Sequence, residues 1–193
     1  MRKCLVLSAL CLVFGVSPAC FAMTSSEAVA IVLNSRNATG ARTFAAAKER
    51  VERDAADGKP LQQFVVGVTT DDKALAKKYL DASRGRIRAL AEKKNNPLAW
   101  YLLSVEQNDM RCLRKAAEGG NVQALNALGT VELQTALTSK VLPSNEVARV
   151  LARSYDCFRQ ATIKQDPNGF VNFGTCYLYG YGCRPDAGLA FRF

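Results

Sequence analysis

The chain has 193 residues, with 26 basic residues, 17 acidic residues and no histidine, which gives a formal net charge of +9. The absence of histidine excludes Ser-His-Asp and Cys-His catalysis and most catalytic metal sites. The chain has neither a P-loop nor a glycine-rich dinucleotide-binding turn. We therefore predict a protein that is not an enzyme, with no catalytic residue, no cofactor and no metal site.

Residues 1–22 have the pattern of an export signal. A short basic start precedes an apolar stretch, Leu5 to Val16, and small residues lead to Ala22. The apolar stretch is too short to span a bilayer comfortably, which favours a cleaved signal over a membrane anchor. We predict cleavage near Ala22, a periplasmic or secreted location, and no integral membrane segment in the mature chain. The alternative is a lipoprotein anchored through Cys20, although Ser17 stands where a lipobox prefers leucine.

Residues 23–84 are predicted to form an N-terminal helical region. The helices are expected to begin at a capping box, Thr24–Glu27, at Arg42, at Leu61, and after Asp71 and Asp72. Asp57 to Pro60 forms a break between two of them. The stretch Leu61 to Val68 is partly β-branched, so a strand is the alternative there.

The pattern that organises the rest of the chain runs from Leu113 to Gly129. It predicts two short helices joined by a tight turn. Gly119 and Gly120 end the first helix, because glycine adopts the left-handed conformation of a helix C-cap without steric cost. Asn121 is the expected N-cap of the second helix.

This pattern recurs 45 residues later, from Phe158 to Gly174. The corresponding residues are Cys112 and Cys157, Arg114 and Arg159, Ala116 and Ala161, Asn121 and Asp166, Ala124 and Gly169, and Gly129 and Gly174. A fainter copy runs from Ile87 to Val105, with Asn95 aligned on Asn121. The agreement of caps, small residues and large residues in one frame predicts a helical-hairpin repeat. A loop from Ser139 to Ser144 accounts for the 45-residue spacing between the two clear copies of the pattern.

In this frame the sequence resembles the Sel1-like repeat family, relatives of the tetratricopeptide repeats. The residues that carry the resemblance are Leu113-Arg114-Lys115-Ala116-Ala117, Ala124, Leu128-Gly129, Phe158-Arg159-Gln160-Ala161, Gly169, Phe173-Gly174, Tyr177, Gly180, Gly182 and Asp186. The resemblance covers residues 85–193, with the last unit incomplete. It implies an all-α solenoid of α/α hairpins, and a scaffold or adaptor that binds protein or peptide partners in the bacterial cell envelope.

Two other functions remain open. One is an envelope enzyme or thiol-dependent protein that acts through a free cysteine of low pKa, Cys112 or Cys183. The other is a basic module that binds anionic surfaces through the charged stretch Lys73 to Lys94. Nucleic acid is not a predicted partner, because no aromatic side chain is spaced to stack on bases. The apolar residues of the incomplete last unit, among them Phe191 and Phe193, predict self-association.

The chain after Ala22 keeps four cysteines, and an even number in an exported chain favours disulfides. In a hairpin that turns near Asp166, Cys157 and Cys176 lie nine and ten residues from the turn, so we predict that they pair. Cys112 and Cys183 are then a second pair or free thiols. Cysteine-rich members of the resembled family bridge their helices at positions that correspond here to Thr162 and Phe170. Neither is a cysteine, so that bridge does not carry over.

Overall fold

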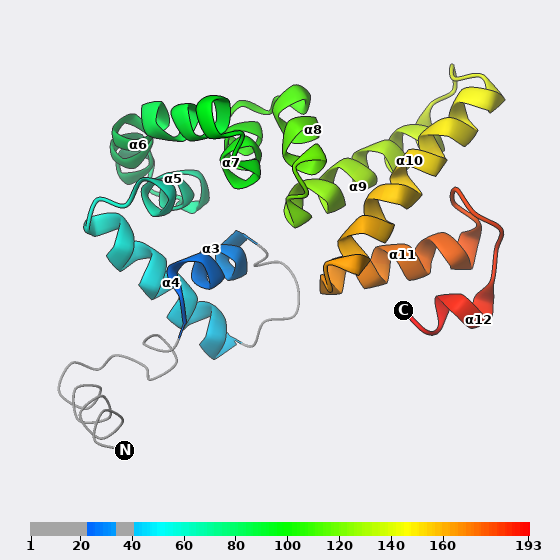
Figure 1. Ribbon diagram of the computed structural model, residues 1–193, viewed down its shortest axis with the longest axis horizontal. Coiled ribbons are helices and arrows are strands. Elements are labelled where there is room, and N and C mark those ends of the chain that lie inside the picture. The colour runs from blue at the N-terminus through cyan, green and yellow to red at the C-terminus, as the bar shows by residue number, and fades with distance from the viewer. Residues whose placement is uncertain (1–22, 34–40) are drawn as a thin grey trace. The chain divides into compact units, whose positions relative to one another are not determined.

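The computed structural model describes residues 23–33 and 41–193, and every regular element in this part of the chain is a helix (Figure 1). The helices are α3 (Ser25–Leu33), α4 (Ala41–Ala56), α5 (Pro60–Thr69), α6 (Lys73–Lys94), α7 (Pro97–Gln107), α8 (Met110–Glu118), α9 (Val122–Thr138), α10 (Ser144–Ile163), α11 (Pro167–Tyr179) and α12 (Ala187–Ala190). The all-α class is therefore confirmed. The strand considered for Leu61–Val68 is wrong, because that stretch lies in α5. The predicted export signal lies outside the described residues.

The chain separates into two compact units, one ending at Ile87 and the other beginning at Arg88. In the first unit, α4 packs against both α3 and α5. The predicted capping box starts α3: the Glu27 amide donates to Thr24 Oγ1 at 3.3 Å, and the Thr24 amide donates to Glu27 Oε2 at 2.7 Å. The buried apolar side chains of this unit include Ala28, Val29, Ala47, Val51, Phe64 and Val65. They place its core between these three helices.

A buried carboxylate joins the helices of this unit. Asp54, on α4, is only 3% exposed and accepts hydrogen bonds from Ser25 Oγ at 2.5 Å, Lys59 Nζ at 2.5 Å and Arg50 Nε at 3.2 Å. Burial alone would raise the pKa of Asp54, but these three donors outweigh it and lower the pKa to about 2. The carboxylate therefore links α3, α4 and the turn that follows α4.

The pKa of Asp54 predicts an acid dependence of stability. Because the folded pKa lies below the ordinary value of 3.8, the ionised carboxylate stabilises the fold above about pH 4, and this contribution is lost as the pH falls towards 2. We expect Asp54→Asn to lower the free energy of unfolding at pH 7 by about 2 kcal/mol and to flatten its decline between pH 4 and 2. Urea unfolding at several pH values measures both effects. An unchanged pH dependence in this variant would contradict the assignment.

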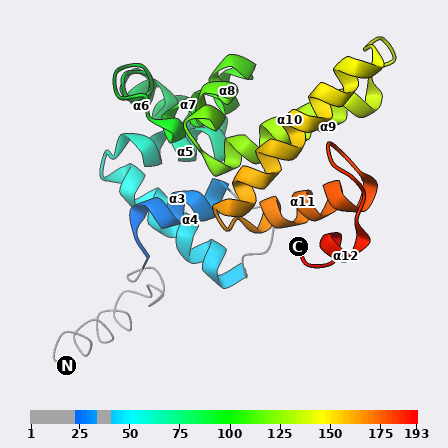
Figure 2. The ribbon, with the colours of Figure 1, turned by 45° about the vertical axis from the view of Figure 1, so that its right-hand side comes forward.

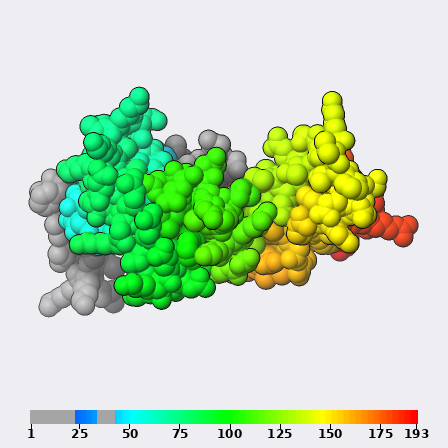
Figure 3. Space-filling model, turned by 90° about the horizontal axis from the view of Figure 1, so that it is seen from above, coloured from blue at the N-terminus to red at the C-terminus, as the bar shows by residue number. Residues whose placement is uncertain are grey.

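The second unit is a succession of helices, each packed against the next from α7 to α12. The two predicted hairpins, α8–α9 and α10–α11, are both present as packed pairs. Helices α9 and α10 lie side by side and antiparallel in both views (Figures 1 and 2). They are joined by the predicted loop, residues 139–143, which lies at the surface with the start of α10 (Figure 3) and in which Val141 is 90% exposed.

The same turn joins successive helices at five places. In each, one residue with positive φ is followed by an extended residue that is the N-cap of the next helix. The five pairs are Gly58-Lys59, Asn95-Asn96, Asn108-Asp109, Gly120-Asn121 and Gln165-Asp166. The turns after α8 and α10 match in hydrogen bonding as well as in sequence. The Asn121 amide donates to the Ala116 carbonyl at 2.9 Å, and the Asp166 amide donates to the Ala161 carbonyl at 3.2 Å.

The predicted caps are confirmed at two of these turns and wrong at one. Asn121 accepts from the Ala124 amide at 2.8 Å, and Asp166 accepts from the Gly169 amide at 3.0 Å. In the fainter copy the cap is Asn96, not the aligned Asn95. Asn96 accepts from the Ala99 amide at 3.0 Å, and Asn95 has the left-handed conformation with φ +47°. The side chain of Asn95 instead accepts a hydrogen bond from the indole of Trp100 at 3.0 Å.

Two helical glycines permit close packing between helices of the second unit. A Cβ at Gly129 would lie 2.7 Å from the ring of Phe158, on α10. A Cβ at Gly169 would lie 2.8 Å from the backbone of Ala161, also on α10. Both distances are shorter than van der Waals contact. The small residues of the repeated pattern therefore let α10 approach α9 on one side and α11 on the other.

The end of the chain folds back on α11. Phe193 packs against Phe173 and Tyr177, with ring centroids 5.0 and 5.9 Å apart, whereas Phe191 is 95% exposed. Self-association through this end stays a prediction, and Phe191 is the more exposed of the two phenylalanines that would take part in it.

Gly→Ala substitutions should have opposite effects on stability in the shared turn and inside a helix. Gly120 has φ +79°, so Gly120→Ala should lower the free energy of unfolding by about 1–2 kcal/mol. Gly85 is exposed within α6, and a Cβ there would meet nothing within 4 Å, so Gly85→Ala should raise the free energy of unfolding by about 0.5–1 kcal/mol. Denaturant unfolding of both variants measures the difference. Equal effects would show that Gly120 is not left-handed in solution.

Candidate functional site

A hollow on the surface of the second unit lies between α8, α9 and α10. Its volume is about 450 Å³, and its lining residues are Arg114, Glu118, Leu128, Glu132 and Arg153. Four of these five side chains carry a charge, two of each sign. The hollow lies within the stretch that carries the predicted repeat, and three different helices contribute to it.

The carboxylate of Glu132 is the unusual group in this hollow. Glu132 is 9% exposed, and its Oε1 accepts from Arg153 Nε at 3.1 Å. Its other oxygen, Oε2, is buried and has no hydrogen-bond partner among the described residues. A buried acceptor without a donor costs free energy. The wall of the hollow therefore holds a carboxylate that is only partly satisfied, with its second oxygen enclosed by the protein.

A second cation lines this hollow, and it comes from α8. Arg114 is exposed and has no ion-pair partner among the described residues. A guanidinium group offers several N–H donors to a carbonyl or a carboxylate. Together with the acceptor on Glu132 and the apolar surface of Leu128, the hollow presents complementary groups to a peptide backbone, which has an N–H donor and a C=O acceptor in every unit.

Glu132 was not predicted as a functional residue from the sequence. The signal was nevertheless present, because Leu125, Leu128, Glu132 and Ala136 have the spacing of one helical face and all four are buried on α9. A charged residue at a core position of such a face is expensive to bury. Arg114 was identified only as a residue of the repeated pattern.

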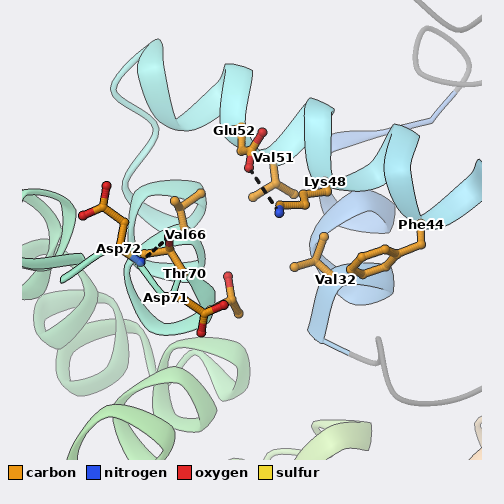
Figure 4. A pocket seen from close by; sticks show the side chains of 10 residues that line it. Val32, Phe44, Lys48, Val51, Glu52, Val66, Thr70, Asp71 and Asp72 are labelled. Carbon is orange, nitrogen blue, oxygen red and sulfur yellow. Dashed lines mark hydrogen bonds and ion pairs between the residues drawn. The ribbon is translucent and has the colours of Figure 1, made fainter. Parts of the chain in front are cut away.

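A second hollow lies within the first unit, between α3, α4, α5 and the start of α6. It has a volume of about 290 Å³ and an apolar part formed by Val32, Phe44, Val51 and Val66 (Figure 4). At its rim Lys48 pairs with Glu52 at 3.9 Å, and Asp72 is held as the cap of α6 by bonds from the amides of Ala74 and Leu75. The lining includes no cysteine, so no nucleophile of that kind faces this hollow.

The structure brings Cys176 and Cys183 together, and the other two cysteines of the described chain have charged neighbours. Cys183 contacts the cluster of Phe158, Phe173 and Cys176, and its thiol points to the Cys176 carbonyl at 3.4 Å. Cys157 lies near the charged groups of Glu132 and Arg153, and Cys112 lies near Asp109. All four are free thiols in the structure. The pairing of Cys157 with Cys176 is therefore not formed there and stays a prediction.

Burial raises the pKa of all four thiols. It raises the pKa of Cys157 to about 11, with the nearby carboxylate of Glu132 adding to the effect. It raises the pKa of Cys176 to about 12, with Cys183 adding to the effect. The pKa values of Cys112 and Cys183 are also raised by burial, and for Cys112 Asp109 contributes further. The thiol-enzyme alternative requires a lowered pKa at Cys112 or Cys183, and the surroundings of both act in the opposite direction.

The described part of the chain, residues 23–33 and 41–193, offers neither a metal site nor a membrane span. Within it no group of three or more Cys, Asp or Glu side chains is arranged to hold a metal ion. None of the described helices is both long and apolar enough to cross a bilayer. Comparison with known protein families, curated proteins and solved structures finds no significant similarity to this chain. The resemblance to Sel1-like repeats thus depends on the residues quoted above.

The thiol environments predict an order of alkylation in the reduced, folded protein. Cys183 is half-buried and borders an open hollow, so iodoacetamide should modify it first. Cys176 is fully buried and has a pKa of about 12, so it should react last. Peptide mass mapping at successive times gives the order, and the denatured chain, in which all four thiols should react alike, is the control. Equal rates at Cys176 and Cys183 in the folded protein would contradict these environments.

Proposed function

We propose that this chain is an exported helical-repeat scaffold of the Sel1-like type that binds protein or peptide partners in the cell envelope. Three features support the proposal: the all-α fold, the recurrence of one turn between successive helices, and the charged hollow between α8, α9 and α10. A helical hairpin cannot bury its apolar face alone, so stacked hairpins form an extended surface on which partners bind.

The charged hollow to which three helices contribute is the observation that carries the proposal. A ligand that fits its lining offers an acceptor to the exposed guanidinium of Arg114, on α8, and a donor to the carboxylate of Glu132, on α9. A segment of polypeptide supplies both from its backbone, and Leu128 offers apolar contact to a side chain. A simple anion would satisfy Arg114 but not Glu132, whereas a simple cation would satisfy Glu132 but not Arg114.

A second candidate is the basic module. Helix α6 exposes seven basic side chains and two acidic ones. The exposed basic residues are Lys73, Lys77, Lys78, Arg86, Arg88, Lys93 and Lys94. Binding of an anionic polymer or lipid surface through these side chains would collapse at moderate salt, because exposed charges are screened over about 8 Å at physiological ionic strength. Binding in the hollow would persist.

Selection of peptides from a displayed random library on the immobilised full chain tests the proposal. We expect Arg114→Ala and Glu132→Gln each to weaken the selected peptides by about tenfold, the size of one lost hydrogen bond to a charged group. Calorimetric titration measures the affinity. Arg88→Ala, an exposed arginine of α6 outside the hollow, is the matched control and should leave the affinity unchanged. Loss of binding in Arg88→Ala, with full affinity in Arg114→Ala, would favour the basic module instead.

A further inference from the structure

The connection after α11 holds two cysteines close together. The carbonyl of Cys176 accepts hydrogen bonds from the amides of Gly180 at 2.8 Å and Tyr181 at 3.0 Å, which end the helix. The thiol of Cys183 donates to this same carbonyl at 3.4 Å. Because a carbonyl oxygen and the sulfur of the same cysteine are only four bonds apart, this contact places the two thiols near each other.

Packing and electrostatics agree with this placement. Cys176 is fully buried, and Cys183 packs against the cluster that contains it. Burial is the main cause of the raised pKa of Cys176, and Cys183 is the second. A thiol influences another in this way only at short range. The remaining thiols have different neighbours: Glu132 and Asp156 at Cys157, and Asp109 at Cys112.

The connection is held in this position by its own backbone. Gly180 and Gly182 both have positive φ, +75° and +74°. A Cβ at Gly182 would lie against the Leu151 carbonyl of α10, so the chain between the cysteines is pressed on that helix. The Asp186 amide then donates to the Tyr177 carbonyl at 2.8 Å. The two sulfurs are thus constrained by the fold before any bond joins them, which favours an intramolecular bond.

We propose that Cys176 and Cys183 form an intramolecular disulfide that fixes the end of α11 to the connection leading to α12. This pairing is an alternative to the one predicted between Cys157 and Cys176, because Cys176 can form only one disulfide. The predicted pair was chosen by counting residues from the turn. Such a count identifies residues that lie at equal distances from the turn on two antiparallel helices, but it does not include which side of each helix a residue faces.

The surroundings of the two thiols assign their roles in forming the bond. Cys183 borders an open hollow of about 440 Å³ together with Tyr155, Tyr177 and Leu189, whereas Cys176 is inaccessible. Cys183 is therefore the thiol that meets an oxidant from solution. Cys176 is the resolving thiol.

A small-molecule disulfide such as glutathione disulfide is the oxidant. The Cys183 thiolate attacks one sulfur of this disulfide and releases one glutathione thiolate. The Cys176 thiolate then attacks the Cys183 sulfur of the mixed disulfide and releases the second glutathione thiolate. The released thiolates take up the two protons that the cysteines lost. Two cysteine thiols have become one disulfide, and glutathione disulfide has been reduced by two electrons to two glutathione molecules.

The experiment starts from the reduced, folded full chain in a buffer rich in glutathione disulfide. Remaining thiols are blocked with N-ethylmaleimide, and the chain is digested without reductant for mass spectrometry. We expect a link between Cys176 and Cys183, with Cys112 and Cys157 blocked. A link between Cys157 and Cys176 would overturn the proposal. So would four blocked thiols in a chain that keeps its helical circular dichroism.

Three variants separate the roles of the thiols. Cys176→Ser should keep glutathione attached to Cys183, because the resolving thiol is gone. Cys183→Ser should form no intramolecular link, and the matched control Cys157→Ser should form the same link as the unchanged chain. If Cys176→Ser does not fold, the other two variants still decide the question, since a link that survives in Cys183→Ser contradicts the proposal. Peptide binding at Arg114 and Glu132 is measured separately, so failure of one proposal does not imply failure of the other.

Discussion

The fold depends on a turn in which the end of one helix is also the beginning of the next. At Gly120-Asn121, the Asn121 amide satisfies a carbonyl at the end of α8, and the Asn121 side chain satisfies an amide at the start of α9. Gln165-Asp166 does the same between α10 and α11. One residue thus forms hydrogen bonds with unpaired backbone groups at the ends of two helices. No further loop is needed between them. Successive helices must then lie against each other.

That constraint explains why small residues are placed where they are. Helices joined by so short a turn cannot separate to accommodate large side chains on both facing surfaces. Gly169 supplies the missing volume between α10 and α11, so that the backbone at Ala161 approaches closely. Gly129 does the same for the ring of Phe158 between α9 and α10, which the longer loop of residues 139–143 joins. The same packing buries Glu132 between α9 and α10 and leaves one of its oxygens unpaired. The candidate binding site is thus a consequence of close helix packing with one polar residue on a core face.

The sequence predicts those features whose physical cause is local. The caps Asn121 and Asp166 were predictable because a side-chain oxygen three residues before an amide acts within one turn of chain. Helix boundaries in the first unit followed from Thr24–Glu27 and from Asp72 for the same reason. The cap at Asn96 was missed because two adjacent asparagines offer the same chemistry. Pro97, in the first turn of α7, fits the observed choice.

Features that depend on how helices face each other were not predictable from spacing. The Cys183 thiol reaches the Cys176 carbonyl, and Cys157 lies near Glu132 and Arg153, because each side chain's surroundings depend on the rotation of its helix. Glu132 and Arg114 come from different helices, and they line one hollow only because α8 and α9 pack together. Backbone NMR of the full chain with one selected peptide tests the central claim most directly. We predict chemical-shift changes clustered at Arg114, Leu128, Glu132 and Arg153. Changes confined to α6, or to the hollow near Phe44, would contradict it.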